Sequence, residues 1–185
     1  MDLDPREYLQ SARFAPDIID QHFPDARRIL TKGIFVSHSG LDSSRIYNEI
    51  ILPVLHVRFA DGIFFHNRES GGADSYKQLV LAALHFCDKV MVVVSQNSVN
   101  NVWVRAEADW AAEHQRPVIH CLLDDSEPGL LYRAQSSSVV PSKDQRIYGQ
   151  VDFRSNFTAA QAKLGYLIDE MLKRYPYRRL GDLPG

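Results

Sequence analysis

The chain contains 185 residues, of which 45% are hydrophobic and 24% charged, and its 21 Lys and Arg residues nearly balance 23 Asp and Glu residues. A chain of this size and composition can bury a core of its own as a single globular domain, without disulfides or a structural metal. The net charge is -2 and the chain has no long basic run. It therefore lacks the positive charge that binding to nucleic acid or to an anionic membrane surface requires. We therefore expect neither nucleic acid nor a membrane as a partner.

The strictly apolar segments are short. The run Val90–Val94 is far below the roughly 20 residues that cross a bilayer. Residues 1–10 are acidic and lack the basic and then apolar pattern of a secretory signal, which predicts a cytoplasmic protein. Cys87 and Cys121 both lie in apolar segments and are predicted to be buried free thiols rather than a bridge.

From Gly33 onward, short apolar runs alternate with amphipathic stretches of helical length, a pattern typical of βαβ units around a parallel sheet. The predicted strands are residues 33–38, 62–66, 89–95, 116–123 and 146–153. The predicted helices are residues 43–58, 76–86, 102–114 and 158–175. We expect the 89–95 run to be the central strand because it is apolar on both alternating faces. Thr158 is the predicted N-cap of the last helix.

Two segments flank this alternation. Residues 1–32 are predicted to add two short helices, which begin at Pro5 and Pro16. This extension either covers a sheet edge or forms an assembly surface. Residues 33–175 form the main domain, and residues 176–185 are predicted to be a flexible tail.

In an open parallel sheet, ligands bind beyond the carboxyl ends of the strands, where the strand order reverses. Three predicted loops lie at such ends. They are "SHSGLDS" at 37–43, "NRESGGADS" at 67–75 and "SQNSVNNVW" at 95–103. The third of these loops leads into the helix predicted over 102–114.

That helix carries a carboxylate where an apolar residue is expected. On a wheel advancing about 100° per residue, its solvated face contains Arg105, Asp109, Ala112 and Glu113. Its opposite face contains Trp103, Val104, Trp110, Ala111 and His114. Glu107 falls in the middle of the second face, one turn after Trp103.

The pattern alone leaves two interpretations of Glu107 open. It can be a structural carboxylate paired with an arginine such as Arg68, because a buried charge without a partner is costly. It can also be a catalytic carboxylate in a cleft whose aromatic walls exclude water.

Other chemistries find less support. Ser37 and His38 are adjacent and would point to opposite sides of a strand, and the chain has no G-x-S-x-G motif, which disfavours a serine hydrolase. Gly71 and Gly72 are not followed by Lys-Ser or Lys-Thr, and no G-x-G-x-x-G follows the first strand. The histidines lack Cys or acidic companions at ligand spacing, so no metal is expected.

Several linked motifs occur in order along the chain. They are "GIFVSHSGLDS" at 33–43, "AALHFCDKVMVVVSQNSVNNVWVRAE" at 82–107 and "RPVIHCLLDD" at 116–125. Together they resemble the Toll/interleukin-1 receptor (TIR) domain family over residues 33–175. The resemblance implies a flavodoxin-like fold, with a five-stranded parallel sheet and helices on both faces.

The resemblance also implies an activity, because similar members cleave NAD+ between nicotinamide and ribose with a glutamate on the third helix. The family motif W-x-x-x-E matches Trp103 and Glu107, which implies that Glu107 is catalytic and that Trp103 offers an aromatic face to the substrate. One ionised carboxylate suffices because nicotinamide leaves as a neutral molecule and needs no general acid.

The remaining substrate contacts are also implied by the resemblance. Ser37, His38 and Ser39 would line the floor of the cleft. The segment Asn67–Asp74 would correspond to the family's BB loop, and Arg68 would contact a phosphate there. His66 stands where many members have Asp and is expected to contact the substrate as well.

These inferences predict a TIR NAD+ glycohydrolase or cyclase that uses NAD+ as substrate and needs no cofactor. Its products would be nicotinamide and ADP-ribose, or a cyclic or conjugated ADP-ribose signal. The predicted setting is bacterial antiviral defence, with self-association through TIR–TIR contacts and a separate effector that senses the product. The alternatives are a non-catalytic TIR scaffold and a nucleoside deoxyribosyltransferase-like enzyme.

Overall fold

A computed structural model describes residues 4–11, 20–21, 24–25, 28, 33–65, 73–133 and 147–174. The strands of the sheet and the helices around it are, in chain order, α1 (Pro5–Ser11), β1 (Ile34–Ser37), η1 (Gly40–Asp42), α4 (Ser43–Ile46), η2 (Tyr47–Leu55), α5 (His56–Phe59), β2 (Ile63–Phe64), α6 (Ala73–Phe86), β3 (Lys89–Val94), α7 (Gln96–Val99), α8 (Val102–Glu113), β4 (Val118–Leu122), η4 (Pro128–Leu131), β5 (Ile147–Asp152) and α9 (Phe157–Arg174).

The five strands form one parallel sheet in the order β2-β1-β3-β4-β5. All residues of β3 are buried, which confirms that the apolar run from Lys89 is the central strand. In the doubly wound α/β class, this order places the reversal of the sheet between β1 and β3. The predicted five-stranded parallel fold is therefore confirmed.

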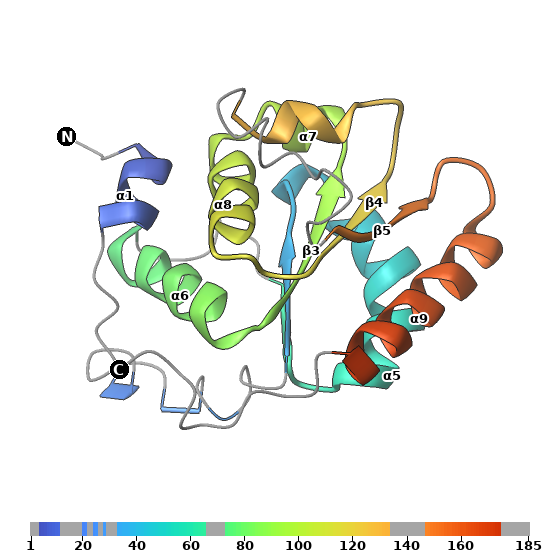
Figure 1. Cartoon of the computed structure of the whole chain (residues 1–185), viewed down its shortest axis with the longest axis horizontal. Helices are drawn as coiled ribbons and strands as arrows, with labels where there is room; N and C mark the ends of the chain where they lie inside the picture. Colours follow the sequence, from blue (N-terminus) through green and yellow to red (C-terminus); the bar gives the residue numbers. More distant parts are fainter. Residues whose placement is uncertain are drawn as a thin grey trace.

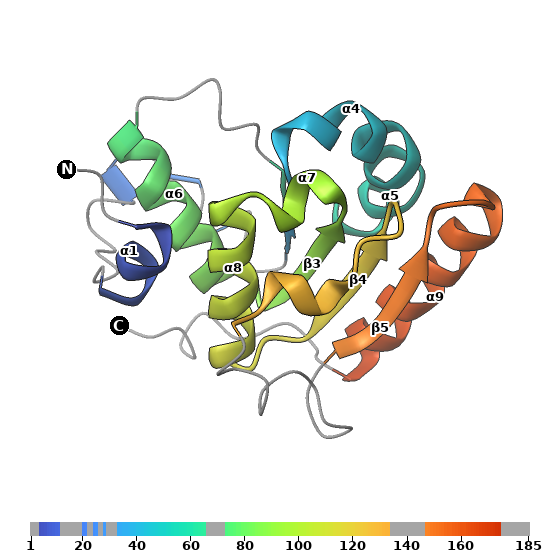
Figure 2. The ribbon, with the colours of Figure 1, turned by 90° about the horizontal axis from the view of Figure 1, so that it is seen from above.

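The two faces of the sheet carry separate hydrophobic cores, because successive strand residues point to opposite sides. In β3, Val90, Val92 and Val94 pack into the core under α6 and α8. Met91 and Val93 pack into the core under η2 and α9. Figures 1 and 2 show the same division, with α1, α6 and α8 on one side of the sheet and α5 and α9 on the other.

The helix predicted over 43–58 is one continuous helical run of three segments. It begins as α4, widens into the π-helical η2 and returns to α-helix in α5. Pro53 lies inside the π segment and has no N–H to donate. A wide π turn lets a helix pass a residue of this kind without stopping.

Two details of the helices differ from the prediction. The segment 96–99, predicted as loop, is the short helix α7, which Ser95 begins with a capping box to Ser98. The N-cap of α9 is Asn156, whose Oδ1 accepts a hydrogen bond from the backbone N of Ala159 at 3.0 Å. The prediction that Thr158 is the cap was wrong because α9 already begins at Phe157.

The first predicted helix of the N-terminal extension is α1, and it packs on another helix. Helix α1 packs against α8, and Leu9 joins the core under α6 and α8. The second predicted helix, which begins at Pro16, and the predicted tail 176–185 lie outside the described residues.

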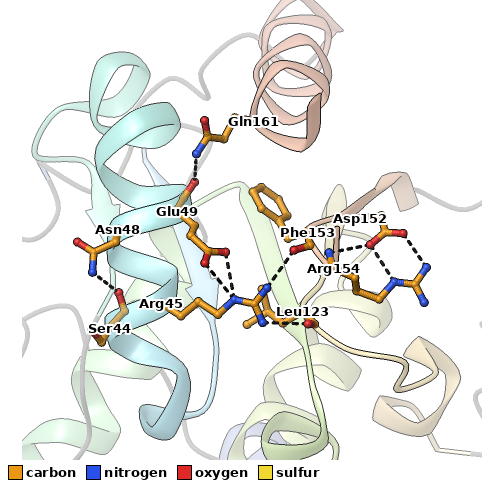
Figure 3. Close-up of polar contacts among 9 residues, drawn as sticks. All are labelled: Ser44, Arg45, Asn48, Glu49, Leu123, Asp152, Phe153, Arg154 and Gln161. Atoms are coloured by element: carbon orange, nitrogen blue, oxygen red, sulfur yellow. Dashed lines mark hydrogen bonds and ion pairs between the residues drawn. The ribbon is translucent and has the colours of Figure 1, made fainter. Parts of the chain in front are cut away.

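Arg45 of α4 joins the ends of β4 and β5 (Figure 3). Its guanidinium donates to the carbonyl oxygens of Leu123 and Phe153, both at 2.9 Å, and its Nε donates to the Glu49 carboxylate. The carboxyl edge of the sheet is thus cross-linked by side chains as well as by the strand ladder.

Among the residues that the structure describes, no helix combines the length and the apolar character needed to span a membrane.

Candidate active site

The switch point between β1 and β3 brings a hydroxyl and a carboxylate together. Ser37 is the last residue of β1, and its position in the strand alternation points it to the α8 side of the sheet, the side that Phe35 also faces. Its Oγ donates a hydrogen bond to Oε2 of Glu107 on α8, at 2.5 Å. Glu107 is 1% exposed and Ser37 is also 1% exposed, so this contact is inside the molecule.

The placement of Glu107 follows from the start of α8. Asn101 caps the helix, and its Oδ1 accepts hydrogen bonds from the backbone N of Trp103 and of Val104. This cap sets the first turn, and one turn later Glu107 faces β1. The prediction that Glu107 lies on the buried face of the helix is confirmed.

His38 does not share this contact. Its ring stacks on Phe65 at 4.3 Å between centroids, and its Nδ1 lies 3.0 Å from the carbonyl oxygen of Val36. Phe65 packs against the core on the opposite face of the sheet from α8. Ser37 and His38 therefore point to opposite sides, which agrees with the sequence argument against a serine–histidine pair.

Ser39 has a local structural role. Its side chain caps η1 by accepting a hydrogen bond from the backbone N of Leu41 at 3.4 Å. The side chain is buried, with 3% of its surface exposed. Ser39 thus shapes the loop after β1.

A carboxylate in that loop ties the two sides of the switch point together, and sequence reasoning gave it no role. Asp42 accepts hydrogen bonds from Ser95 Oγ at 2.6 Å and from Asn97 Nδ2 at 2.8 Å. Ser95 follows β3 and Asn97 lies on α7. The sequence feature that could have predicted this contact is the position of the two polar loops, after β1 and β3, at the carboxyl ends of neighbouring strands.

A second carboxylate, Asp124, joins the loop after β4 to the same set of hydrogen-bonded loops. Asp124 accepts a hydrogen bond from the backbone N of Gln96 at 2.8 Å and another from the backbone N of Ser126. These hydrogen bonds lower the pKa of Asp124, against the opposing effect of burial. The loops after β1, β3 and β4 are thereby held in one arrangement.

Trp103 lies one turn before Glu107, and its ring contacts the N-terminal extension. It meets the Tyr8 ring edge-to-face, with 6.3 Å between centroids. Its side chain is half-buried. The resemblance implies that Trp103 offers an aromatic face to a substrate. A substrate that stacked on Trp103 would have to do so beside Tyr8, which already contacts this ring.

His66 and Arg68 lie outside the described residues, as does most of the segment Asn67–Asp74. Their predicted contacts with the substrate therefore stay predictions.

Burial favours the neutral forms of two cysteines and one histidine in the core of the sheet. Burial raises the pKa of the Cys87 and Cys121 thiols, which are free and buried as predicted. Burial also lowers the pKa of His120 to about 4, and its Nε2 lies 2.6 Å from the Tyr132 hydroxyl. Within the described ranges, no group of three or more His, Cys, Asp or Glu side chains could hold a metal ion.

These features define a class: a doubly wound parallel α/β domain that carries a buried carboxylate beside the switch point of its sheet. A family model described as TIR domain matches residues 34–164, and the chain therefore belongs to the TIR domain family. No curated protein and no solved structure matches the chain.

Proposed function

We propose that this TIR protein cleaves the bond between nicotinamide and ribose in NAD+, with Glu107 as the catalytic carboxylate. The observation that carries the proposal is the hydrogen bond from Ser37 to Glu107, since it holds an acidic side chain at the switch point where this class of sheet binds ligands. Membership of the TIR family supports the same reaction, because the family includes enzymes that cleave NAD+.

The chemistry needs one carboxylate only. The bond between ribose C1′ and the pyridinium nitrogen breaks, and its electron pair neutralises the cationic ring, so nicotinamide leaves without a proton. Glu107 would stabilise the oxocarbenium-like ribose through its negative charge. Attack of water at C1′ gives ADP-ribose and a proton, and attack of an adenine nitrogen gives a cyclic product.

The burial of Glu107 adds a requirement. A carboxylate that is 1% exposed can reach NAD+ only after part of its cover moves, while α8 and β1 keep Glu107 in place. We propose that self-association through TIR–TIR contacts supplies this opening, as expected for an enzyme that makes a signal in antiviral defence. A separate effector would then sense the product.

The same burial favours a second candidate function. A Glu that is enclosed and hydrogen-bonded to a strand serine can be purely structural, which would suit a non-catalytic TIR scaffold. Both candidate functions predict self-association, and only the enzyme predicts cleavage of NAD+.

The deciding experiment follows nicotinamide release from NAD+ by chromatography, using the full chain over a range of protein concentrations. Glu107→Gln is the variant, because it keeps the shape and can still accept from Ser37. We expect release that increases more than linearly with protein concentration and is absent in folded Glu107→Gln protein. No release at any concentration, including under crowding, would leave the scaffold as the function.

A further inference from the structure

The middle of helix α8 is enclosed on all sides. Every residue from Ala106 to Ala111 is buried. Because successive residues of a helix are about 100° apart, a stretch buried for more than one turn has no solvated side. The predicted solvated face was wrong at Asp109, which is 3% exposed. The sheet covers one side of α8, and another part of the chain must cover the other.

Helix α1 supplies much of that cover, and η4 also packs against α8. Arg6 Nη2 lies 2.7 Å from Asp109 Oδ2, and Tyr8 meets Trp103 edge-to-face. Leu9 of α1 is 3% exposed in the core that α8 shares. The contacts thus reach from the first turn of α8 to its second half, and both views of the molecule place α1 beside α8 (Figures 1 and 2).

Asp109 is the polar centre of this interface. Burial raises its pKa, while the backbone N of Arg133 and the charges of Arg6 and Arg133 act in the opposite direction. The backbone N of Arg133 donates to Oδ1 at 3.1 Å. Glu113, one turn later on the same helix, raises the pKa further. The cations that favour the charged form of Asp109 therefore lie outside α8.

Glu107 and Asp109 face opposite sides of α8, because they are two positions apart on a helix. Glu107 is held by Ser37 of β1, and Asp109 is held by Arg6 of α1. The helix is thus fixed between two polar contacts, one to the sheet and one to the N-terminal extension. A rotation of α8 that broke one contact would displace the other.

We propose that α1 is a clamp on α8, and that Arg6 and Tyr8 are positioning residues for the reaction of Glu107. This inference rests on the proposed function for its kinetic consequence only. The clamp makes the N-terminal extension part of the functional unit, since it sets the rotation of the helix that presents the carboxylate. Arg6 and Tyr8 act through α8.

The kinetic experiment compares kcat and KM for NAD+ cleavage in full-length variants. Tyr8→Ala and Arg6→Ala are expected to lower kcat by roughly tenfold or more with KM nearly unchanged, because a small displacement of a catalytic group mainly costs transition-state stabilisation. Tyr8→Phe keeps the ring edge and should retain the activity of the parent. Unchanged or increased kcat in Tyr8→Ala and Arg6→Ala would overturn the clamp.

Arg58→Ala is the matched control for the loss of an ion pair. Arg58 bonds the Asp169 carboxylate at 2.8 and 3.0 Å and joins α5 to α9 on the opposite face of the sheet. It should leave kcat unchanged. A loss of kcat in Arg58→Ala equal to that in Arg6→Ala would mean that both variants act through general destabilisation, and the clamp would be wrong.

The double variant Arg6→Ala with Asp109→Asn separates positioning from the cost of a buried charge. Asparagine needs no cation, so the double variant should recover stability relative to Arg6→Ala. Its kcat should stay low because nothing joins α1 to α8 at this point. Recovery of kcat together with stability would show that the ion pair has only a structural role.

Amide hydrogen exchange tests the clamp without any turnover. The amides of α8 should exchange faster in Tyr8→Ala and Arg6→Ala than in the parent or in Arg58→Ala. If the parent does not cleave NAD+, the proposed function fails while this comparison still decides the clamp. Equal protection of α8 in all four proteins would contradict it.

Discussion

At the scale of single residues, the hydrogen bond between Ser37 and Glu107 is the feature that gives the switch point its chemistry. A buried carboxylate that accepts a short hydrogen bond from a hydroxyl is held in one orientation. Both side chains are 1% exposed, so water does not compete for the bond.

Ser37→Ala removes the donor and leaves Glu107 buried with one hydrogen bond fewer. We expect the free energy of unfolding to fall by about 2 kcal/mol, the typical cost of leaving a buried polar group without its hydrogen-bond partner. Urea denaturation measures the loss. Ser43→Ala is the control, because Ser43 Oγ is buried and makes no hydrogen bond within the described part of the chain. Equal losses in the two variants would mean that the Ser37 contact contributes nothing of its own.

His120 makes the stability of the fold sensitive to acid. Burial lowers its pKa from 6.5 to about 4, so below pH 6.5 the unfolded chain binds a proton that the folded chain takes up only near pH 4. The free energy of unfolding therefore falls as the pH drops through this window. The contribution of His120 is on the order of 3 kcal/mol.

His120→Gln should make the pH dependence of the unfolding free energy shallower between pH 6.5 and pH 4, in urea denaturation at a series of pH values. His85, whose pKa burial also lowers to about 4, is present in both proteins, so the difference isolates His120. The same slope in both proteins would contradict the prediction.

At the scale of elements, polar side chains just outside the helices decide where each helix begins. Ser95 caps α7, Asn101 caps α8 and Asn156 bonds the first turn of α9. Helix α7 follows β3 at the carboxyl edge of the sheet, and α8, which carries Glu107, follows α7. The caps therefore set the geometry of the candidate site as well as the helix ends.

Asn156→Ala is expected to lower the free energy of unfolding by about 1 kcal/mol, because it leaves a backbone N–H of the first turn of α9 without its acceptor. Thr158→Ala, at an exposed position already inside the helix, should change it little. Chemical denaturation of both variants compares the two positions. A larger loss in Thr158→Ala would restore Thr158 as the cap.

At the scale of the whole molecule, side chains cross-link the carboxyl edge of the sheet from β1 to β5. Asp42 joins the loops after β1 and β3, and Asp124 joins the loop after β4 to α7. Arg45 joins the ends of β4 and β5 (Figure 3). The edge that carries the candidate site is therefore a connected frame.

Arg45→Met keeps the length of the side chain and removes all of its donors, so two strand-end carbonyls lose their partner. We expect the free energy of unfolding to fall by about 3 kcal/mol, measured by thermal unfolding. Arg154→Met is the control, since Arg154 bonds the carboxylates of Asp125 and Asp152 at the surface, where ion pairs contribute little. A comparable loss of stability in Arg154→Met would contradict the role of Arg45 in this frame.

Much of the fold could be predicted from local patterns in the sequence. The alternation of apolar runs with amphipathic stretches predicts the strands, the helices and the central position of β3, because these depend on residues within a few positions of one another. The periodicity of α8 also predicts that Glu107 is buried, and the linked motifs predict the TIR family. The first two inferences need only near neighbours along the chain, and the third needs only the order of short motifs.

Contacts between distant segments were decided by the tertiary structure. The partner of Glu107 is Ser37, which lies 70 positions away along the chain. The burial of Asp109 depends on Arg6 of α1, although its own helix predicts a solvated position. Patterns of polarity describe which face of a helix can be buried, and the packing of distant helices and strands determines which face is buried and against what.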